Sequence, residues 1–147
     1  MQRGDIAGRR DADSPATAGE GLPRSRRLTR SRHFQEAYAQ GRKWAGRYMV
    51  LYLRSGDDAA LRLGVVASRR LGGAVKRNRA RRLLREAFRR ERPHMHGDFD
   101  VVLVARREIL EADWQSIREE LRRLARRAGL LGEPVSGSSE QPVGAEQ

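Results

Sequence analysis

Residues 74–88 read AVKRNRARRLLREAF, and this stretch indicates both the fold and the surface of the chain. At 100° per residue, its apolar side chains gather on one side of a helix. These are Ala80, Leu83, Leu84, Ala87 and Phe88. Six basic residues and a single acid, Glu86, fill most of the remaining positions. The pattern predicts a helix with one face on a protein core and the other turned toward a polyanion.

The basic residues of this helix are predicted to form a ridge. Every fourth position from Arg77 to Arg89 is an arginine, so consecutive members lie about 6 Å apart along the axis, close to the phosphate repeat of a nucleic-acid strand. Residues 69–92 hold eleven Lys or Arg against two Glu, whereas an ordinary solvated face mixes both signs. Asn78 lies in the charged sector, where its amide can bond a base or a ribose. Nucleic acid is therefore the expected partner.

The positive charge is concentrated in the middle of the chain. The 147 residues have a net charge of +12, but residues 22–131 alone hold 28 basic and 12 acidic residues. Such a domain repels itself unless a polyanion neutralises it. The flanking residues 1–21 and 132–147 have no apolar periodicity and are predicted to be disordered, the second as an acidic tail. One domain, residues 22–131, remains, and its length suffices to bury a core.

Several classes of protein are disfavoured by composition. The chain has no cysteine, which excludes disulfides and thiolate metal sites. No run approaches the roughly 18 apolar residues of a membrane span. No apolar signal segment follows Arg9 and Arg10, so the cytoplasm is the expected compartment.

Helical and strand patterns alternate along the domain. Thr29 or Ser31 is predicted to cap a short helix that ends at Gly41. Strand-forming residues then occupy 48–53 and 61–66. After the basic helix, residues 99–105 (FDVVLVA) form an apolar run that is typical of a strand buried on both faces.

The last helix is predicted to begin after Asp113, which can cap it, and to run to Ala128 with apolar residues every three or four positions. Glu119 and Glu120 lie about one turn before Arg123, so part of its charge is expected to be paired internally. The order helix, two or three strands, helix, strand, helix predicts an α/β sandwich with one small sheet.

Three aromatic residues are candidates for base stacking. Phe34 and Tyr38 lie four residues apart on the first predicted helix, and Tyr52 lies on the strand that follows. On an exposed sheet face, each such ring stacks an unpaired base with about 1–3 kcal/mol. The residue pattern by itself favours packing in the core for all three.

A second cluster has the residue types of a metal site. His94, His96, Asp98 and Asp100 are close in sequence, but metal-dependent phosphodiester hydrolysis needs several convergent carboxylates. These residues fall in a short connection between a helix and a strand. No catalytic residue and no metal ligand is assigned to the chain, and a protein-only nuclease that uses these four residues is kept as an alternative.

Residues 28–131 resemble the protein subunit of bacterial ribonuclease P, the ribonucleoprotein that removes 5′ leaders from precursor tRNA. The most specific match is Arg77-Asn78-Arg79, followed by Arg81, Arg82 and Arg85. Three further pieces match in the expected order: 34–38 with Gly41, 47–52 and 63–70.

The resemblance implies an α+β fold, namely an α/β sandwich of three helices and a small mixed sheet of about four strands, like domain 2 of ribosomal protein S5. It places the basic helix in a left-handed βαβ crossover, an exception to the usual right-handed rule.

The resemblance also implies a division of labour. A catalytic RNA supplies the active site and binds most of the Mg²⁺, and the reaction is a Mg²⁺-dependent hydrolysis that leaves a 5′-phosphate on the tRNA. The protein binds that RNA and the single-stranded 5′ leader, with no small-molecule substrate. Phe34, Tyr38 and Tyr52 would contact the leader. The residues that would face the catalytic RNA are Arg69, Arg70, Lys76, Arg77, Asn78, Arg79, Arg81, Arg82 and Arg85.

Two positions depart from the family pattern. Arg69 and Arg70 stand where two lysines are common, and Tyr38 stands where Phe is frequent. The arginines keep the positive charge of the lysines, and Tyr38 keeps an aromatic ring that can stack on a base. The alternative from another class is a structural, ribosome-associated RNA-binding protein with the same charge and no role in cleavage.

Overall fold

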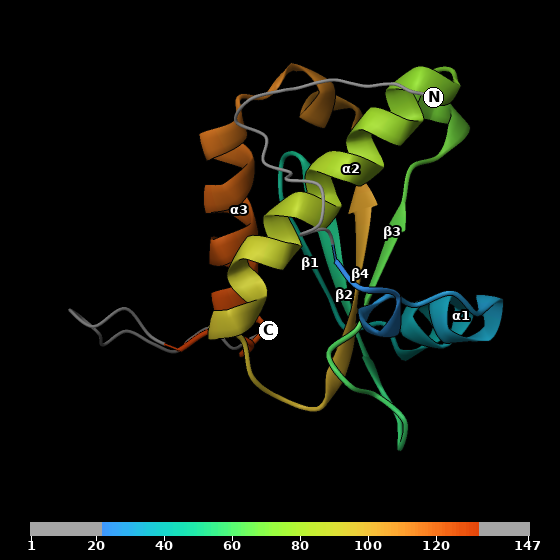
Figure 1. Cartoon of the computed structure of the whole chain (residues 1–147), viewed down its shortest axis with the longest axis vertical. Helices are drawn as coiled ribbons and strands as arrows, with labels where there is room; N and C mark the ends of the chain where they lie inside the picture. Colours follow the sequence, from blue (N-terminus) through green and yellow to red (C-terminus); the bar gives the residue numbers. More distant parts are fainter. Residues whose placement is uncertain (1–21, 133–147) are drawn as a thin grey trace.

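The computed structural model describes residues 22–132. The two segments predicted to be disordered, residues 1–21 and all but the first residue of 132–147, lie outside this range. One four-stranded sheet forms the centre of the molecule, with strand order β1-β2-β4-β3 (Figure 1). The strands are β1 Lys43–Ala45, β2 Met49–Ser55, β3 Leu63–Val66 and β4 Phe99–Ala105.

The strand pairing makes the sheet mixed. β2 pairs antiparallel with both β1 and β4, and β3 pairs parallel with β4. The three α-helices are α1 Ser31–Gln40, α2 Ala74–Glu91 and α3 Trp114–Arg127. This confirms the predicted sandwich, with three strands between the first two helices. β2 begins one residue and ends two residues later than predicted, β3 begins two residues later, and β4 matches its predicted range. β1 had no predicted range of its own.

The basic helix connects the two parallel strands. α2 follows β3 and precedes β4, and it lies in front of the sheet in the view of Figure 1. With both strands running upward in that view, β4 lies to the left of β3, so the crossover is left-handed. The expected exception to the right-handed rule is therefore present.

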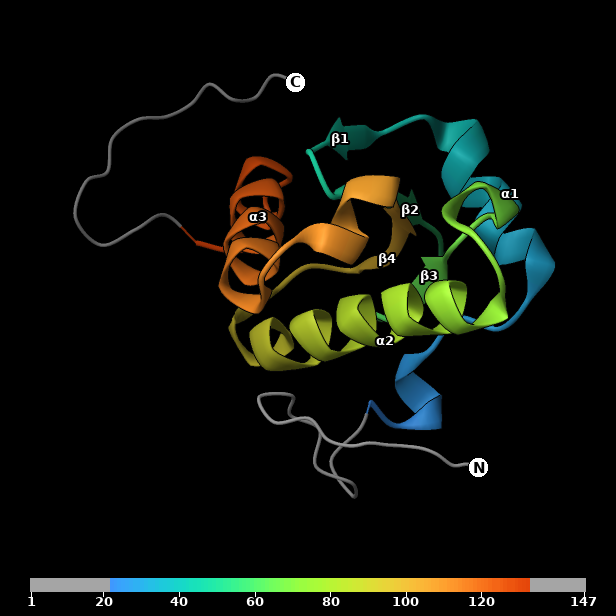
Figure 2. The same cartoon turned by 90° about the horizontal axis from the view of Figure 1, so that it is seen from above.

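Helices cover the two faces of the sheet unequally. Leu51, Leu53 and Leu103 are fully buried in the main core, which α2 and α3 complete. The alternate positions on the other face belong to a smaller cluster, in which α1 contributes Ala37 and Phe34. Figure 2 shows α2 and α1 on opposite sides of the sheet. The α1 face keeps several half-buried side chains, among them Tyr52 and Val104.

The caps of the first and last helices differ. Asp113 caps α3 as predicted, because its carboxylate accepts a hydrogen bond from the amide of Ser116 at 2.8 Å. The predicted cap of α1 by Thr29 or Ser31 is wrong. The N-cap position is Arg30, and no side chain in the described part of the chain bonds that helix end. Contacts along the body of α1 hold it instead.

Glu120 has a role in addition to the predicted one. It lies 2% exposed beneath the turn between β1 and β2, and its carboxylate accepts hydrogen bonds from the amides of Arg47, Tyr48 and Met49 at 2.7–3.0 Å. The expected ion pair with Arg123 is present, and its distance of 3.4 Å is longer than those of the three hydrogen bonds from the backbone. Glu120 thus ties α3 to the first hairpin.

Candidate RNA-binding surfaces

α2 is amphipathic in the way that its sequence predicts. Ala80, Leu84, Ala87 and Phe88 are fully buried, and Leu83 is half-buried against the same core. The opposite side of the helix carries the predicted RNA-contacting residues. Of these, Lys76, Asn78, Arg79 and Arg82 are exposed, whereas Arg77, Arg81 and Arg85 are half-buried.

Ion pairing divides α2 into two halves. Near its C-terminus, Glu86 pairs with Arg89 and Arg90, and Glu91 pairs with two arginines of α3. Within residues 22–132, no carboxylate forms an ion pair with the basic residues of the first half, which are Lys76, Arg77, Arg79, Arg81, Arg82 and Arg85. The predicted ridge therefore ends at Arg85, because Arg89 belongs to the paired half.

Two side chains of the unpaired half are already oriented by hydrogen bonds. Arg81 donates to the amide oxygen of Asn78 at 2.7 Å, which leaves the Asn78 amide NH₂ as the donor toward solvent. Arg79 donates to the carbonyl oxygen of Leu110 at 3.1 Å. Holding a guanidinium in place before RNA arrives lowers the conformational entropy lost on binding.

Arg85 is surrounded by charge of its own sign. Burial lowers the pKa of its guanidinium, and the neighbouring charges of Arg27, Arg81 and Arg82 lower it further. Arginine nevertheless stays protonated in proteins, so the repulsion remains and favours an anion at this place. Arg27 was not predicted to belong to this surface. An isolated β-bridge pairs Arg27 with Leu63 of β3, and no local sequence pattern reveals this contact.

The two arginines that precede α2 lie in a short 3-10 helix, η4 Arg69–Leu71, and both are exposed. Ser68 caps this turn by accepting a bond from the amide of Arg70. Arg107, which was also not predicted to belong to this surface, donates to the carbonyl oxygen of Arg70 at 3.3 Å. The basic surface of α2 therefore extends to the turn that precedes the helix.

The aromatic residues meet on the other face of the sheet. The rings of Tyr38 and Tyr52 lie edge to face, with centroids 5.0 Å apart and planes at 77°. Tyr38 is 42% exposed, and burial of its remainder raises the pKa of its hydroxyl, as does Tyr52. The ammonium group of Lys43 lies 6.0 Å from the centroid of the Tyr52 ring. Aromatic planes and a cation thus share one open surface.

Phe34 is placed for packing more than for stacking. A side chain at Gly64 would come within 2.5 Å of the Phe34 ring, so the ring lies directly on the backbone of β3. Phe34 also packs against the cluster of Leu28 and Val102. Of the three predicted leader-contacting residues, Tyr38 is the most accessible, Tyr52 is half-buried and Phe34 forms the floor of the contact between α1 and the sheet.

The four residues considered as a metal site do not form one site. His94, His96 and Asp98 are exposed, but Asp100 is fully buried. The carboxylate of Asp100 accepts hydrogen bonds from Arg54, from Arg62 and from two backbone amides. Among residues 22–132, no group of three or more acidic or histidine side chains is arranged to hold a metal ion. In the same part of the chain, no helix is long and apolar enough to cross a membrane.

Comparison with known proteins agrees with this geometry. Residues 22–129 match the family model described as Ribonuclease P. The ribonuclease P protein component of Chloroflexus aurantiacus is 36% identical over 127 residues, covering 83% of this chain and 94% of the relative. That of Symbiobacterium thermophilum is 39% identical over 111 residues, covering 75% and 96%.

Two solved structures are similar as well. The RNase P protein of Staphylococcus aureus superimposes with a TM-score of 0.65 at 28% identity, covering 73% of this chain and 98% of that one. The RNase P protein of Thermotoga maritima gives a TM-score of 0.60 at 32% identity, covering 68% and 96%. The chain therefore belongs to the family of ribonuclease P protein components, subunits of the ribonucleoprotein nuclease that processes tRNA.

Proposed function

We propose that this chain binds the catalytic RNA of ribonuclease P through the unpaired half of α2 and holds the 5′ leader of precursor tRNA on the open α1 face. The observation that carries the proposal is the contrast within α2. Its C-terminal arginines have carboxylate partners, whereas six basic residues of its N-terminal half have none in the described chain. An RNA backbone supplies the missing negative charge.

The leader assignment is supported by accessible aromatic planes beside cations. An unstructured 5′ leader is single-stranded RNA, and its bases are free to stack on tyrosine rings. Tyr38 and Tyr52 supply such rings, and Lys43 is near enough to Tyr52 to contact an adjacent phosphate. The helices that carry the two proposed surfaces, α2 and α1, lie on opposite sides of the sheet (Figure 2). One RNA subunit and the strand that it cuts can therefore be bound together.

The proposed division of labour assigns the chemistry to the RNA. Mg²⁺ prefers oxygen ligands and retains much of its water, which suits RNA phosphates. We therefore assign Mg²⁺ mainly to the RNA subunit. The metal ion would activate water for hydrolysis, leaving a 5′-phosphate on the tRNA. The protein residues bind the leader and raise the affinity for precursor over mature tRNA.

Reconstitution tests this proposal. The cognate catalytic RNA is incubated with precursor tRNA at limiting Mg²⁺, with and without the protein. We expect the protein to accelerate leader removal and to lower the dissociation constant for precursor tRNA while leaving that for mature tRNA almost unchanged. Cleavage by the protein alone would favour a protein-only nuclease. No effect in either mixture would favour a structural RNA-binding protein.

A further inference from the structure

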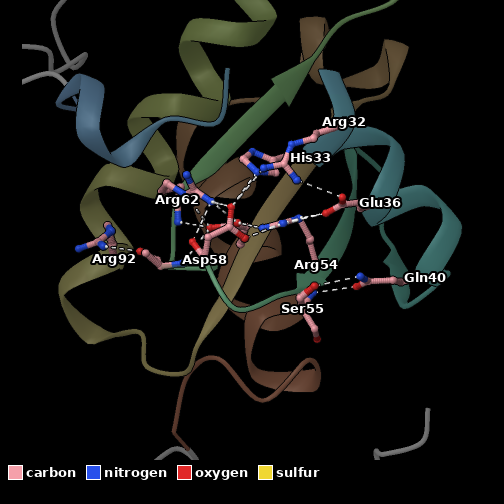
Figure 3. Close-up of polar contacts among 11 residues, drawn as sticks. Arg32, His33, Glu36, Gln40, Arg54, Ser55, Asp58, Arg62 and Arg92 are labelled. Atoms are coloured by element: carbon pink, nitrogen blue, oxygen red, sulfur yellow. Dashed lines mark hydrogen bonds and ion pairs between the residues drawn. The ribbon is translucent and has the colours of Figure 1, made fainter. Parts of the chain in front are cut away.

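α1 carries a polar stripe beside its aromatic face. His33, Glu36 and Gln40 recur at intervals of three and four residues, so they lie along one side of the helix. All three side chains bond to the end of β2 or to the loop that follows it (Figure 3). Phe34 and Tyr38 occupy the neighbouring side of the same helix. Any shift of the stripe therefore moves both rings.

Arg54 is the centre of these contacts. Its side chain is only 2% exposed, and it donates to three carboxylates from three separate segments. Nε bonds Glu36 of α1 at 2.8 Å, Nη1 bonds Asp100 of β4 at 2.7 Å, and Nη2 bonds Asp58 of the β2–β3 loop at 2.8 Å. The planar guanidinium fixes the directions of these bonds, so it sets the place of Glu36 relative to the sheet.

Two further contacts attach the stripe. The side chain of Gln40 both donates to the carbonyl oxygen of Ser55, at 2.9 Å, and accepts from its amide, at 2.7 Å. At the other end of α1, Nε2 of the buried His33 lies 3.0 Å from a carboxylate oxygen of Asp58. α1 is thus attached to β2 and its loop at three points along its length. We call Glu36, Gln40, Arg54 and Ser55 the clamp.

Apolar burial by itself gives α1 little anchoring. Of its ten residues only His33 and Ala37 are buried, and the half-buried ring of Phe34 packs on Gly64. No side chain within residues 22–132 caps its first turn. A short helix with so small an apolar contact is free to slide or tilt on a sheet, because dispersion and hydrophobic burial are not directional. Directional hydrogen bonds to a buried guanidinium remove that freedom.

We infer that the clamp is a positioning device for the leader, because it fixes the distance of Tyr38 from Tyr52 and so the width of the surface on which a base stacks. This inference rests on the proposed function, and it adds residues that need not touch RNA. The clamp residues act through Tyr38 and Tyr52. Losing the clamp should therefore reduce leader recognition while the α2 surface stays intact.

The test uses the double variant Glu36→Ala/Gln40→Ala. Arg54 keeps Asp58 and Asp100 as partners in this variant, so its buried charge stays compensated and the chain is expected to fold. The matched control is Gln35→Ala, because Gln35 is an exposed neighbour on the same helix whose side chain forms no hydrogen bond within residues 22–132. Glu36→Gln is the conservative variant, since its amide oxygen can still accept from Arg54.

Holoenzymes reconstituted with each protein are compared for binding precursor and mature tRNA. In the double variant we expect the preference for precursor to fall about fivefold or more, equivalent to one lost base stack. Affinity for the catalytic RNA should not change, and the single variant Glu36→Gln should keep most of the preference. Gln35→Ala should match the unmodified protein. An NMR measurement of the Tyr38–Tyr52 ring contact in the free protein reports the helix position without RNA.

The outcomes separate the inference from the proposed function. Unchanged precursor preference in a double variant that has lost the ring contact overturns the inference, as does an intact ring contact in that variant. Equal loss of affinity for precursor, mature tRNA and catalytic RNA also overturns it, since that is general unfolding. Absence of any precursor preference in the unmodified holoenzyme overturns the proposed function and this inference with it.

Discussion

Arg54 has a large influence on stability for a single residue, because it compensates buried charge. Asp100 is fully buried beside it, and Arg62 is its other cationic partner. Removing one partner from a buried ion pair typically costs about 3–5 kcal/mol. Because Arg62 remains, we expect Arg54→Ala to lower the free energy of unfolding by about 3 kcal/mol, measured by urea denaturation.

Arg32 provides the control for this prediction. It also bonds Glu36, at 3.4 Å, but its side chain is 60% exposed. Solvent-exposed ion pairs contribute little to stability. Arg32→Ala should therefore leave the free energy of unfolding almost unchanged. Similar losses in the two variants would show that burial of Arg54 is not what matters.

The same carboxylates make stability depend on acid pH. The hydrogen bond from Arg54 lowers the pKa of Glu36 and of Asp58 below their ordinary values. For Asp100, burial by itself raises the pKa, but hydrogen bonds from Arg62 and from the backbone outweigh it, so the pKa is lowered. A carboxyl with a lower pKa in the folded state stabilises the fold above its unfolded-state pKa and loses that effect as pH falls.

We therefore expect a level free energy of unfolding from pH 7 to about pH 5 and a steady fall below about pH 4, where unfolded carboxyls take up protons. Urea denaturation at a series of pH values measures this. In Arg54→Ala the fall should be shallower, because Glu36 and Asp58 lose their shared partner. An equally steep fall in both proteins would contradict the assignment to Arg54.

At the scale of elements, Glu120 joins α3 to the first hairpin. Its carboxylate is the hydrogen-bond acceptor for three successive amides, those of residues 47–49. A buried donor left without a partner costs about 1–3 kcal/mol, and water can reach the exposed end of this turn. We expect Glu120→Ala to destabilise the protein by about 3 kcal/mol and to speed amide hydrogen exchange at 47–49.

Glu119 is the neighbouring control. It is exposed, and its carboxylate accepts a bond from Gln115 at 3.2 Å. Glu119→Ala should change neither stability nor exchange at the hairpin. Faster exchange at residues 47–49 in Glu119→Ala would show that general fraying of α3, and not the carboxylate of Glu120, controls the turn.

The elements that the sequence predicts well are those with a strong local pattern. α2 has a long apolar periodicity and β4 a continuous apolar run, and the N-cap at Asp113 needs only Ser116, three residues away. The polar clamp and the role of Glu120 could not be predicted, since both join residues that are far apart in the sequence. Glu120 occupies a position where the sequence pattern predicts a charged residue exposed to solvent. Nothing in that pattern indicates that its partners are backbone amides far away in the sequence.

The same limit applies to the candidate site. The α2 residues were predicted because they are contiguous, and four of the seven are exposed whereas three are half-buried. Arg27 lies near enough to Arg85 to repel its charge, and it is brought there by the bridge between Arg27 and Leu63 of β3. For the aromatic residues, periodicity could place Phe34 and Tyr38 on one side of α1 but could not tell that Phe34 lies on Gly64 while Tyr38 faces solvent.

At the scale of the whole molecule, the question is whether RNA affinity comes from net charge or from particular phosphate-binding residues. Each phosphate that the protein neutralises contributes about 0.7–0.9 to the slope of log affinity against log salt concentration. Removing two phosphate-binding arginines from α2 should therefore reduce the slope by about 1.4–1.8. We expect this for Arg81→Ala/Arg85→Ala, with binding to the catalytic RNA measured from low to high salt.

A variant with the same loss of charge elsewhere makes this test specific. Arg126→Ala/Arg127→Ala removes two charges from the end of α3, so its net charge equals that of the α2 variant. If particular arginines bind particular phosphates, the α3 variant keeps nearly the full slope, because diffuse charge beyond a Debye length of about 10 Å is screened. Equal reductions in the two variants would mean that the excess positive charge attracts RNA without a defined docking face. Unfolding midpoints measured for both variants ensure that folded proteins are compared.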